Sequence, residues 1–234
     1  MDGFFVRVGI DSTKEYGGWN APYEPTNGRF AFIPIPEKQG LKKKLARYYN
    51  EFIPTLNKFD ISLPKHLIGM PVHIDPDFEN LTYGDHNKRA KQLSSLKSGD
   101  FIVFYAGLRS TNANTKRLVY AIIGFYFVKK IIRAIDLPKC KWGVNAHARR
   151  IIDDSDIIIF ANKKCSGRLL KAIVIGEYRK RAYRVKKDYL KLWGGLKVKN
   201  GYIQRSGTLP KIKEPLKFIK WWERQNITLV HRNN

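Results

Sequence analysis

Two long apolar segments constrain the fold of this chain more than any other feature. Residues 101–108 read FIVFYAGL, and residues 118–135 are rich in β-branched and aromatic side chains. Such runs are typical of buried strands, and an isolated glycine inside one, here Gly124, is typical of a bulge. We therefore predict a strand followed by a second, long or bent strand. Neither run approaches the roughly 20 apolar residues that a membrane span needs, so no membrane partner is expected.

The rest of the chain mixes short strands and short helices. Further strands are expected at residues 4–10, 29–35, 156–161 and 169–178. Helices are expected at residues 41–52, 86–96, 145–152, 188–193 and 216–224. Because strands and helices do not alternate, this order predicts an α+β fold. With no linker in sight, we expect a single domain over residues 1–234, built as a curved mixed sheet or small barrel decorated by short helices.

Charge is the strongest functional signal. The 234 residues include 44 Lys and Arg but 20 Asp and Glu, which gives a net charge of +24. Residues 1–100 are near neutral, with 14 basic and 12 acidic residues, whereas residues 101–234 hold 30 basic and 8 acidic residues. A chain so charged repels itself, so a polyanionic partner is expected. We predict nucleic acid, with DNA ahead of RNA; the alternative is a passive, lysine-rich solvated surface.

Cysteine usage and the N-terminal sequence point to a cytoplasmic protein. Cys140 and Cys165 are too few for a disulfide framework or a four-ligand zinc site. No signal-peptide pattern precedes the first expected strand. We expect a reducing, cytoplasmic setting, and the scarcity of Gln, Cys and Met favours a thermophilic source.

Carboxylates gather in a segment broken by prolines. Asp75, Asp77 and Asp85 lie there, and Asp11 lies in an earlier turn-rich loop. Clustered carboxylate oxygens bind Mg²⁺ or Mn²⁺, which stabilise charge developing at a phosphate, and His73 could add a nitrogen ligand. We therefore take all four aspartates as candidate metal ligands, and Asp75 and Asp77 as candidate catalytic residues. The alternative is that these side chains form turns and cap helices.

Two further segments could contact a nucleotide. Tyr16 and Trp19 flank two glycines in the early loop, where a ring could stack on a base drawn out of the duplex. His147 is a candidate general acid–base, and Arg149 and Arg150 beside it could clamp a phosphate. The alternatives are that Trp19 fills the core and that the second segment is a helix end with solvated arginines.

The most basic segment, residues 178–187, interleaves cations with two tyrosines. It suits contacts to a nucleic-acid backbone, and the alternative is a merely solvated edge. The candidate backbone contacts in it are Arg179, Lys180, Arg181, Arg184, Lys186 and Lys187. Further on, residues 201–207 carry Gln204 and Arg205, each able to make paired hydrogen bonds to a base edge. Their alternative is a hairpin turn.

Several longer motifs resemble the third family of nucleotide-modification-associated domains. They are RVGID at residues 7–11, YGGWNAP at 16–22, FIPIPE at 32–37, HIDPDFE at 73–79, LTYGD at 81–85 and GDFIVFYAGL at 99–108, with shorter matches at 145–147, 166–170 and 201–205. The resemblance covers nearly the whole chain. It implies a protein linked to DNA bases that carry modifications, and it supplies no mechanism. Tyr83, inside LTYGD, joins Tyr16, Trp19, Gln204 and Arg205 as a candidate base-binding residue.

Residues 99–178 also resemble PUA-like folds, which include readers of modified bases, through their strand order and the Gly99-Asp100 turn before a strand. Three hypotheses follow. The leading one is a DNA-binding protein that recognises or processes modified or unusual bases, with the basic half on the phosphate backbone. The second is an enzyme, either a nuclease that uses Mg²⁺ or Mn²⁺ or a base-excising glycosylase. The third is a PUA-like module that binds RNA.

Overall fold

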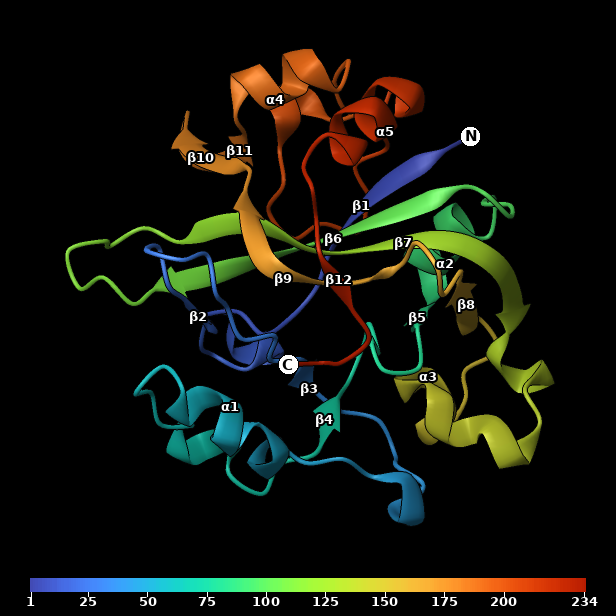
Figure 1. The fold of residues 1–234 in the computed structure, drawn as a ribbon. Coiled ribbons are helices and arrows are strands. Elements are labelled where there is room, and N and C mark those ends of the chain that lie inside the picture. The colour runs from blue at the N-terminus through green and yellow to red at the C-terminus, as the bar shows by residue number, and fades with distance from the viewer.

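A sheet built around two long strands organises the computed structural model, which describes residues 1–234 (Figure 1). Strands β6 (Phe101–Ser110) and β7 (Val119–Arg133) pair antiparallel. Because β7 has 15 residues, its other edge accommodates two partners in succession. Its first half pairs with β9 (Gly167–Val174), and its second half pairs with β8 (Ile157–Ala161).

Shorter strands extend this sheet at both sides. Parallel to β6 run β1 (Gly3–Arg7) and β2 (Pro22–Tyr23). Antiparallel to β8 and β9 run β5 (Thr82–Asp85) and β12 (Leu229–Val230), respectively. Two separate hairpin-like pairs are β3 (Ile35–Pro36) with β4 (Val72–His73), and β10 (Gly176–Arg179) with β11 (Ala182–Val185). The strand path β1-β6-β7-β8-β5 stays open at both ends, so of the two expected architectures the curved mixed sheet is present and a closed barrel is not.

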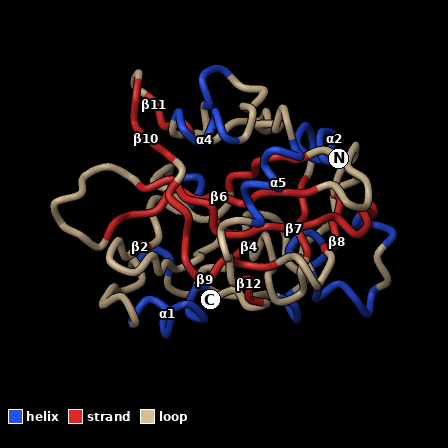
Figure 2. The backbone as a smooth tube through the Cα atoms, turned by 45° about the horizontal axis from the view of Figure 1, so that its top comes forward, coloured by secondary structure: helices blue, strands red, loops and turns tan.

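The helices are short and lie on both sides of the sheet. They are α1 (Ile53–Asn57), α2 (Asn87–Leu93), α3 (Ala146–Arg149), α4 (Lys187–Leu192) and α5 (Pro215–Glu223). Helices α4 and α5 lie together above the sheet in Figure 1, and α1 and α3 lie below it. Figure 2 shows the strands of the large sheet crossing the middle of the molecule, with α1, α2 and α4 toward its edges. The longest α-helix has nine residues, and none of the helices has the length and apolarity needed to cross a membrane.

The core lies on both faces of the β6–β7 pair because side chains alternate along a strand. On one face, Phe101 stacks on Phe218 of α5 with ring centroids 5.5 Å apart. On the other face, Phe104 meets the edge of Phe78 at 5.9 Å. A continuous cluster of 52 buried apolar residues, drawn from both the near-neutral and the basic half, includes all four rings. The α+β prediction is confirmed.

The predicted bulge is also confirmed. The β7 register shifts between Ile122 and Gly124 where β7 meets β9, and it shifts again opposite β6. A Cβ at Gly124 would lie 2.4 Å from the ring of Phe78, which is fully buried. Glycine is required here because the aromatic ring occupies the space of a side chain.

Three expected elements were wrong. Residues 29–34 form a mostly buried connection rather than a strand, and only Ile35 belongs to a strand, the two-residue β3. Pro34 and Pro36 lack the N–H groups of a ladder, and the backbone of Phe32 bonds instead to the side chain of Asn234. Residues 41–52 form two 3₁₀ turns rather than a helix, and their backbone bonds to remote segments, as Lys42 N–H does to the Arg149 carbonyl. Residues 169–178 divide into β9 and β10.

Replacing Gly124 by alanine should destabilise the protein by about 1–3 kcal/mol, the usual cost of overpacking a core. The added methyl group would displace Phe78, which three other rings hold in place. Gly143→Ala is the matched control, because a Cβ there meets nothing within 4 Å. Denaturant unfolding measures both variants, and equal stability of the two would contradict this packing.

Candidate functional site

Two adjoining cavities, of about 310 and 260 Å³, form a single cleft. The two cavities share five of their lining residues, namely Tyr16, Ile35, His73, His86 and His147. We call this the histidine cleft. Its lining comes from segments far apart in the sequence, and polar side chains predominate. Its size matches that of small-molecule sites in proteins.

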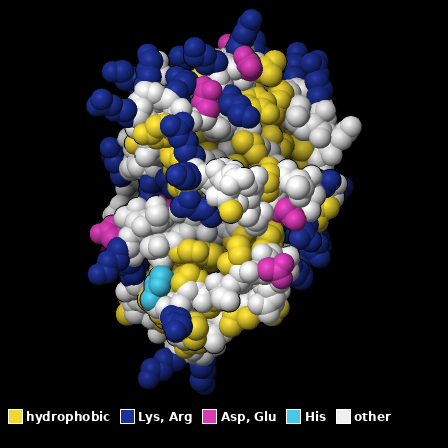
Figure 3. All heavy atoms as spheres, turned by 90° about the vertical axis from the view of Figure 1, so that its left-hand side faces the viewer, with side chains coloured by type: hydrophobic (Ala, Val, Ile, Leu, Met, Phe, Trp, Pro, Cys, Tyr) yellow, Lys and Arg dark blue, Asp and Glu magenta, His cyan; other side chains and the backbone are white.

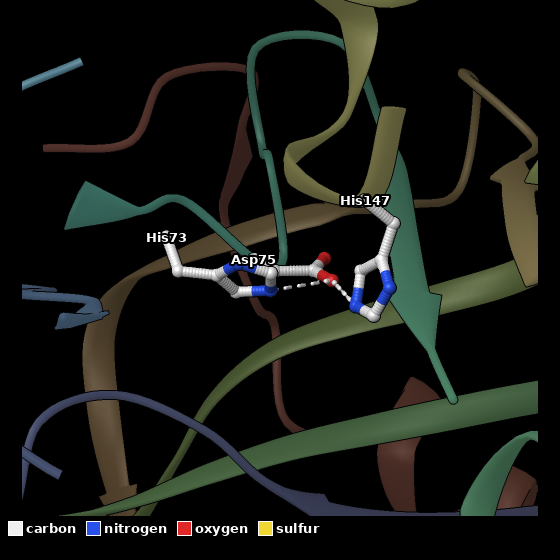
Figure 4. A group of neighbouring side chains, drawn as sticks. All are labelled: His73, Asp75 and His147. Atoms are coloured by element: carbon white, nitrogen blue, oxygen red, sulfur yellow. Dashed lines mark ion pairs between the residues drawn. The ribbon is translucent and has the colours of Figure 1, made fainter. Parts of the chain in front are cut away.

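At the centre of the histidine cleft, two imidazoles face one carboxylate (Figure 4). The Nε2 atom of His73 lies 3.8 Å from Asp75 Oδ2, and the Nε2 atom of His147 lies 3.4 Å from the same oxygen. The opposite nitrogen of each ring contacts a second carboxylate. His73 Nδ1 is 2.6 Å from Glu37, and His147 Nδ1 is 2.6 Å from Asp156.

The local fold explains how these groups converge. His73 ends strand β4, and Asp75 follows two residues later. The N–H of Gly84 in β5 donates to both oxygens of Asp75, at 3.0 and 2.8 Å. Asn145 caps α3 by accepting from His147 N–H, and its amide donates to Asp75 at 3.4 Å. A Cβ on Gly84 would lie 2.3 Å from the His147 ring, so only glycine lets β5 and α3 approach this closely.

Burial dominates the electrostatics of the cluster. It lowers the pKa of His147 to about 4, although the hydrogen bond to Asp156 opposes the shift. It raises the pKa of Asp75 well above its ordinary value; the Gly84 N–H opposes this, and the nearby carboxylates of Asp85 and Asp77 add to it. Burial alone would also raise the pKa of Asp156, but its hydrogen bond with His147 and the charge of Arg150 hold that pKa below the ordinary value.

The other predicted aspartates are each paired with arginine. Asp11 lies 3.4 Å from Arg7 and 2.9 Å from Arg205. Asp77 lies 2.6 Å from Arg149. It also accepts two backbone N–H groups, as expected of an aspartate that forms a turn. Asp85 pairs with Arg89 at 3.0 Å. No group of three possible ligand atoms includes Asp11, Asp77 or Asp85, so the structure does not assemble the four aspartates into one metal site.

Three of the five candidate base-binding residues line the histidine cleft. They are Tyr16, Tyr83 and Arg205. The other two have different contacts. Trp19 packs against the core, as the alternative interpretation of that loop predicted, and the Gln204 side chain accepts a hydrogen bond from the Tyr183 N–H. His147 and Asp75 line the cleft as well, whereas Asp77 is fully buried outside it.

The candidate backbone contacts fall into two groups. Arg149 and Arg150 are buried in ion pairs with Asp77 and Asp156, so neither is free to grip an external phosphate from the surface. The remaining six lie on or directly after the β10–β11 hairpin, where Lys180, Arg181 and Lys187 are exposed. Figure 3 shows the side of the molecule that carries this hairpin, where Lys and Arg side chains are numerous, especially along its edges, and acidic side chains are few.

Sequence reasoning missed several residues of the cleft. Glu37 and Arg7 lie inside the FIPIPE and RVGID motifs, so the density of motifs was the available signal. Arg89 and Asp156 lie outside every quoted motif. The i,i+4 spacing of Asp85 and Arg89 was a signal for that ion pair, whereas no spacing signals the contact of Asp156 with His147. Both cysteines are free thiols.

Fold and cleft together define an α+β protein with a buried polar site in which histidine, aspartate and arginine converge. The chain belongs to the family Nucleotide modification associated domain 3, whose family model matches residues 3–210. The resemblance drawn from the motifs is therefore confirmed. Comparison with curated proteins and with solved structures finds no match.

In the metal-free protein, His147 should make stability depend on pH in a defined window. Its folded pKa of about 4 lies below the unfolded value of 6.5, so acid protonates the unfolded chain first. The stabilisation is complete above pH 6.5 and is lost as the pH falls toward 4. Between pH 6.5 and 4, the free energy of unfolding of the native chain should fall by on the order of 3 kcal/mol more than that of the His147→Gln variant. Urea unfolding at a series of pH values tests this, and parallel curves would contradict it.

Proposed function

We propose that this chain binds nucleic acid, DNA ahead of RNA, and takes a modified or unpaired nucleotide into the histidine cleft for recognition or processing. One observation carries the proposal: a cationic wall beside the His–Asp–His centre. Arg7, Arg89, Arg205 and the exposed Lys88 line the cleft there. Membership of a nucleotide-modification family supports the same reading.

The charge of this wall favours an anionic ligand. Asp11 and Asp85 are the two carboxylates that pair with its arginines. The wall has four positively charged side chains, so it keeps an excess of positive charge. The Nε–H of Arg7 is buried and makes no hydrogen bond within the protein, so a donor remains available. Guanidinium groups suit phosphate because they donate in a planar fork.

An aromatic ring lies at the same wall. The guanidinium of Arg205 lies 3.9 Å from the centroid of the half-buried Tyr16 ring, and Asp11 fixes that guanidinium from the other side. A ring held in this way can stack on a base that leaves the duplex. Stacking together with cationic donors suits a whole nucleotide better than a free phosphate.

The β10–β11 hairpin supplies a surface for the backbone of the nucleic acid. Lys180 and Arg181 form its tip, and β11 contacts the segment that leads into the cleft. Arg184 in β11 forms an antiparallel bridge with Tyr202, and the Tyr183 carbonyl accepts from the Ile203 N–H. Arg205 follows two residues after Ile203 in the same segment. Backbone binding and nucleotide capture are thus linked through one short stretch of chain.

An enzyme is the second candidate function. It is favoured by the convergence of Asp75 with His73 and His147 at the floor of the same cleft, which would place reactive groups against a captured nucleotide. A metal-dependent nuclease or a base-excising glycosylase acting on DNA fits this arrangement. An RNA-binding module is the outcome if RNA is bound in preference to DNA.

The hairpin tip offers a test in which charge and stability separate. Lys180 and Arg181 have φ of 51° and 58°, the left-handed values of a two-residue turn that favours Asn-Gly. The double variant Lys180→Asn, Arg181→Gly should therefore keep or raise stability while it weakens binding to duplex DNA of any sequence. The slope of log affinity against log salt should fall by about 2. Fluorescence anisotropy at several salt concentrations measures this, and unchanged affinity would contradict the role of the hairpin.

Tyr16→Ala should act differently. We expect it to abolish tighter binding to a duplex with one mismatched or abasic position, because extrusion is easiest there and stacking is worth about 1–3 kcal/mol per base. Affinity for a fully paired duplex should stay unchanged. Trp19→Phe is the control, since Trp19 lies in the same loop but packs against the core. If the native chain shows no preference for the unpaired site, or binds no nucleic acid, the proposed function is wrong.

A further inference from the structure

Two imidazole nitrogens and one carboxylate oxygen converge in the histidine cleft. One ligand atom from each of His73, Asp75 and His147 lies within 4.8 Å of the other two. Both imidazoles direct Nε2 at Asp75 Oδ2, from opposite sides of the carboxylate (Figure 4). Lone pairs that face one another in a buried site repel unless a proton or a metal cation lies among them.

The outer contacts of both rings are compatible with metal binding through Nε2. His73 Nδ1 lies 2.6 Å from Glu37, and His147 Nδ1 lies 2.6 Å from Asp156. An Nδ1–H that donates to a carboxylate leaves Nε2 unprotonated in a neutral ring. Histidines that bind metals almost always have such a carboxylate or carbonyl partner on the opposite nitrogen. Both rings here have one.

Asp75 is the buried aspartate of this region without a cationic side chain. Asp77, Asp85 and Asp156 each pair with an arginine at 3.0 Å or closer. Asp75 has no Lys or Arg within 4 Å, and its neighbours are two imidazoles and backbone or amide donors. A buried carboxylate is costly without a compensating positive charge. A metal ion held between the two imidazoles and this carboxylate would supply that charge.

We propose that His73 Nε2, Asp75 Oδ2 and His147 Nε2 bind one divalent first-row transition-metal ion, with its remaining coordination positions open to the histidine cleft. Two ligand atoms about 2.1 Å from a tetrahedral ion are about 3.4 Å apart. The present separations of 3.4 and 3.8 Å from Asp75 Oδ2 are close to this spacing. Three protein ligands and an open position are typical of catalytic rather than structural sites.

The donor set selects the kind of ion. Imidazole suits Zn²⁺, Fe²⁺, Co²⁺ and Ni²⁺, whereas Mg²⁺ and Ca²⁺ prefer oxygen ligands. Two histidines and one carboxylate therefore favour the first group over the Mg²⁺ expected for a cluster of aspartates. A second possible group, His86 with His147 and Asp156, is weaker because Asp156 Oδ1 already contacts His147 Nδ1 and Arg150. The site itself rests on this geometry alone, and its role toward a nucleotide rests on the proposed function.

Titration of the chelator-treated full chain with Co²⁺ and Zn²⁺ tests the site. We expect one ion per chain, a visible Co²⁺ spectrum of high intensity, and displacement of Co²⁺ by Zn²⁺. Asp75→Asn and His147→Gln should each weaken binding at least 100-fold. Glu37→Gln removes only an outer partner, so it should stay folded and weaken binding 10–100-fold. His86→Gln is the control and should bind as the native chain does.

Each contrary result has one meaning. Absence of stoichiometric binding, or equal affinity in Asp75→Asn, overturns the site. Loss of binding in His86→Gln with retention in Asp75→Asn overturns it too, in favour of the second group. Fluorescence anisotropy with duplex DNA, measured for both the metal-free and the metal-loaded chain, tests nucleic-acid binding independently of the metal site. Binding of one ion without any nucleic-acid binding would remove the proposed function and leave the metal site intact.

Discussion

The close approach of β5 to α3 at Gly84 is the contact on which the site depends. Gly84 N–H holds the Asp75 carboxylate, and the missing side chain admits the His147 ring. This contact depends in turn on the length of β7, whose second half positions β8, which then pairs with β5. A shorter β7 would leave β5 without a neighbour and the carboxylate without its donors. The packing of the sheet thus determines where the reactive groups lie.

Buried charge is the second constraint. Arginine–aspartate pairs surround the cleft, including Arg149 with Asp77 and Arg150 with Asp156. Such pairs add little net stability, because the desolvation of both ions offsets their attraction, but loss of one partner is strongly destabilising. Their consequence here is geometric, since each pair fixes a side chain next to Asp75 or His147. Asp75 differs from these aspartates because no arginine reaches it, and that difference underlies the metal proposal.

The sequence predicts much of the sheet and part of the site. Continuous apolar runs identify β6 and β7, since a buried strand needs apolar side chains on both faces. Residues 29–35 have a similar composition, but prolines and the contact of Phe32 with Asn234 leave all of them except Ile35 in a connection. His147 and Asp75 were recognisable from residue type and motif. The sequence also suggested His73 as a nitrogen ligand beside the aspartates. That His147 joins these two residues was not predicted, because it results from the pairing of β3 with β4 and of β5 with β8, contacts between segments far apart in the sequence.

The cationic wall and the His–Asp–His centre both line the histidine cleft and face the same space. The most direct measurement is a crystal structure of the zinc-loaded chain with a short duplex that contains one unpaired nucleotide. The account predicts that the nucleotide leaves the stack and lies between Tyr16 and the arginine wall, with zinc on His73, Asp75 and His147. A duplex bound elsewhere with every base stacked and the cleft unoccupied would contradict it.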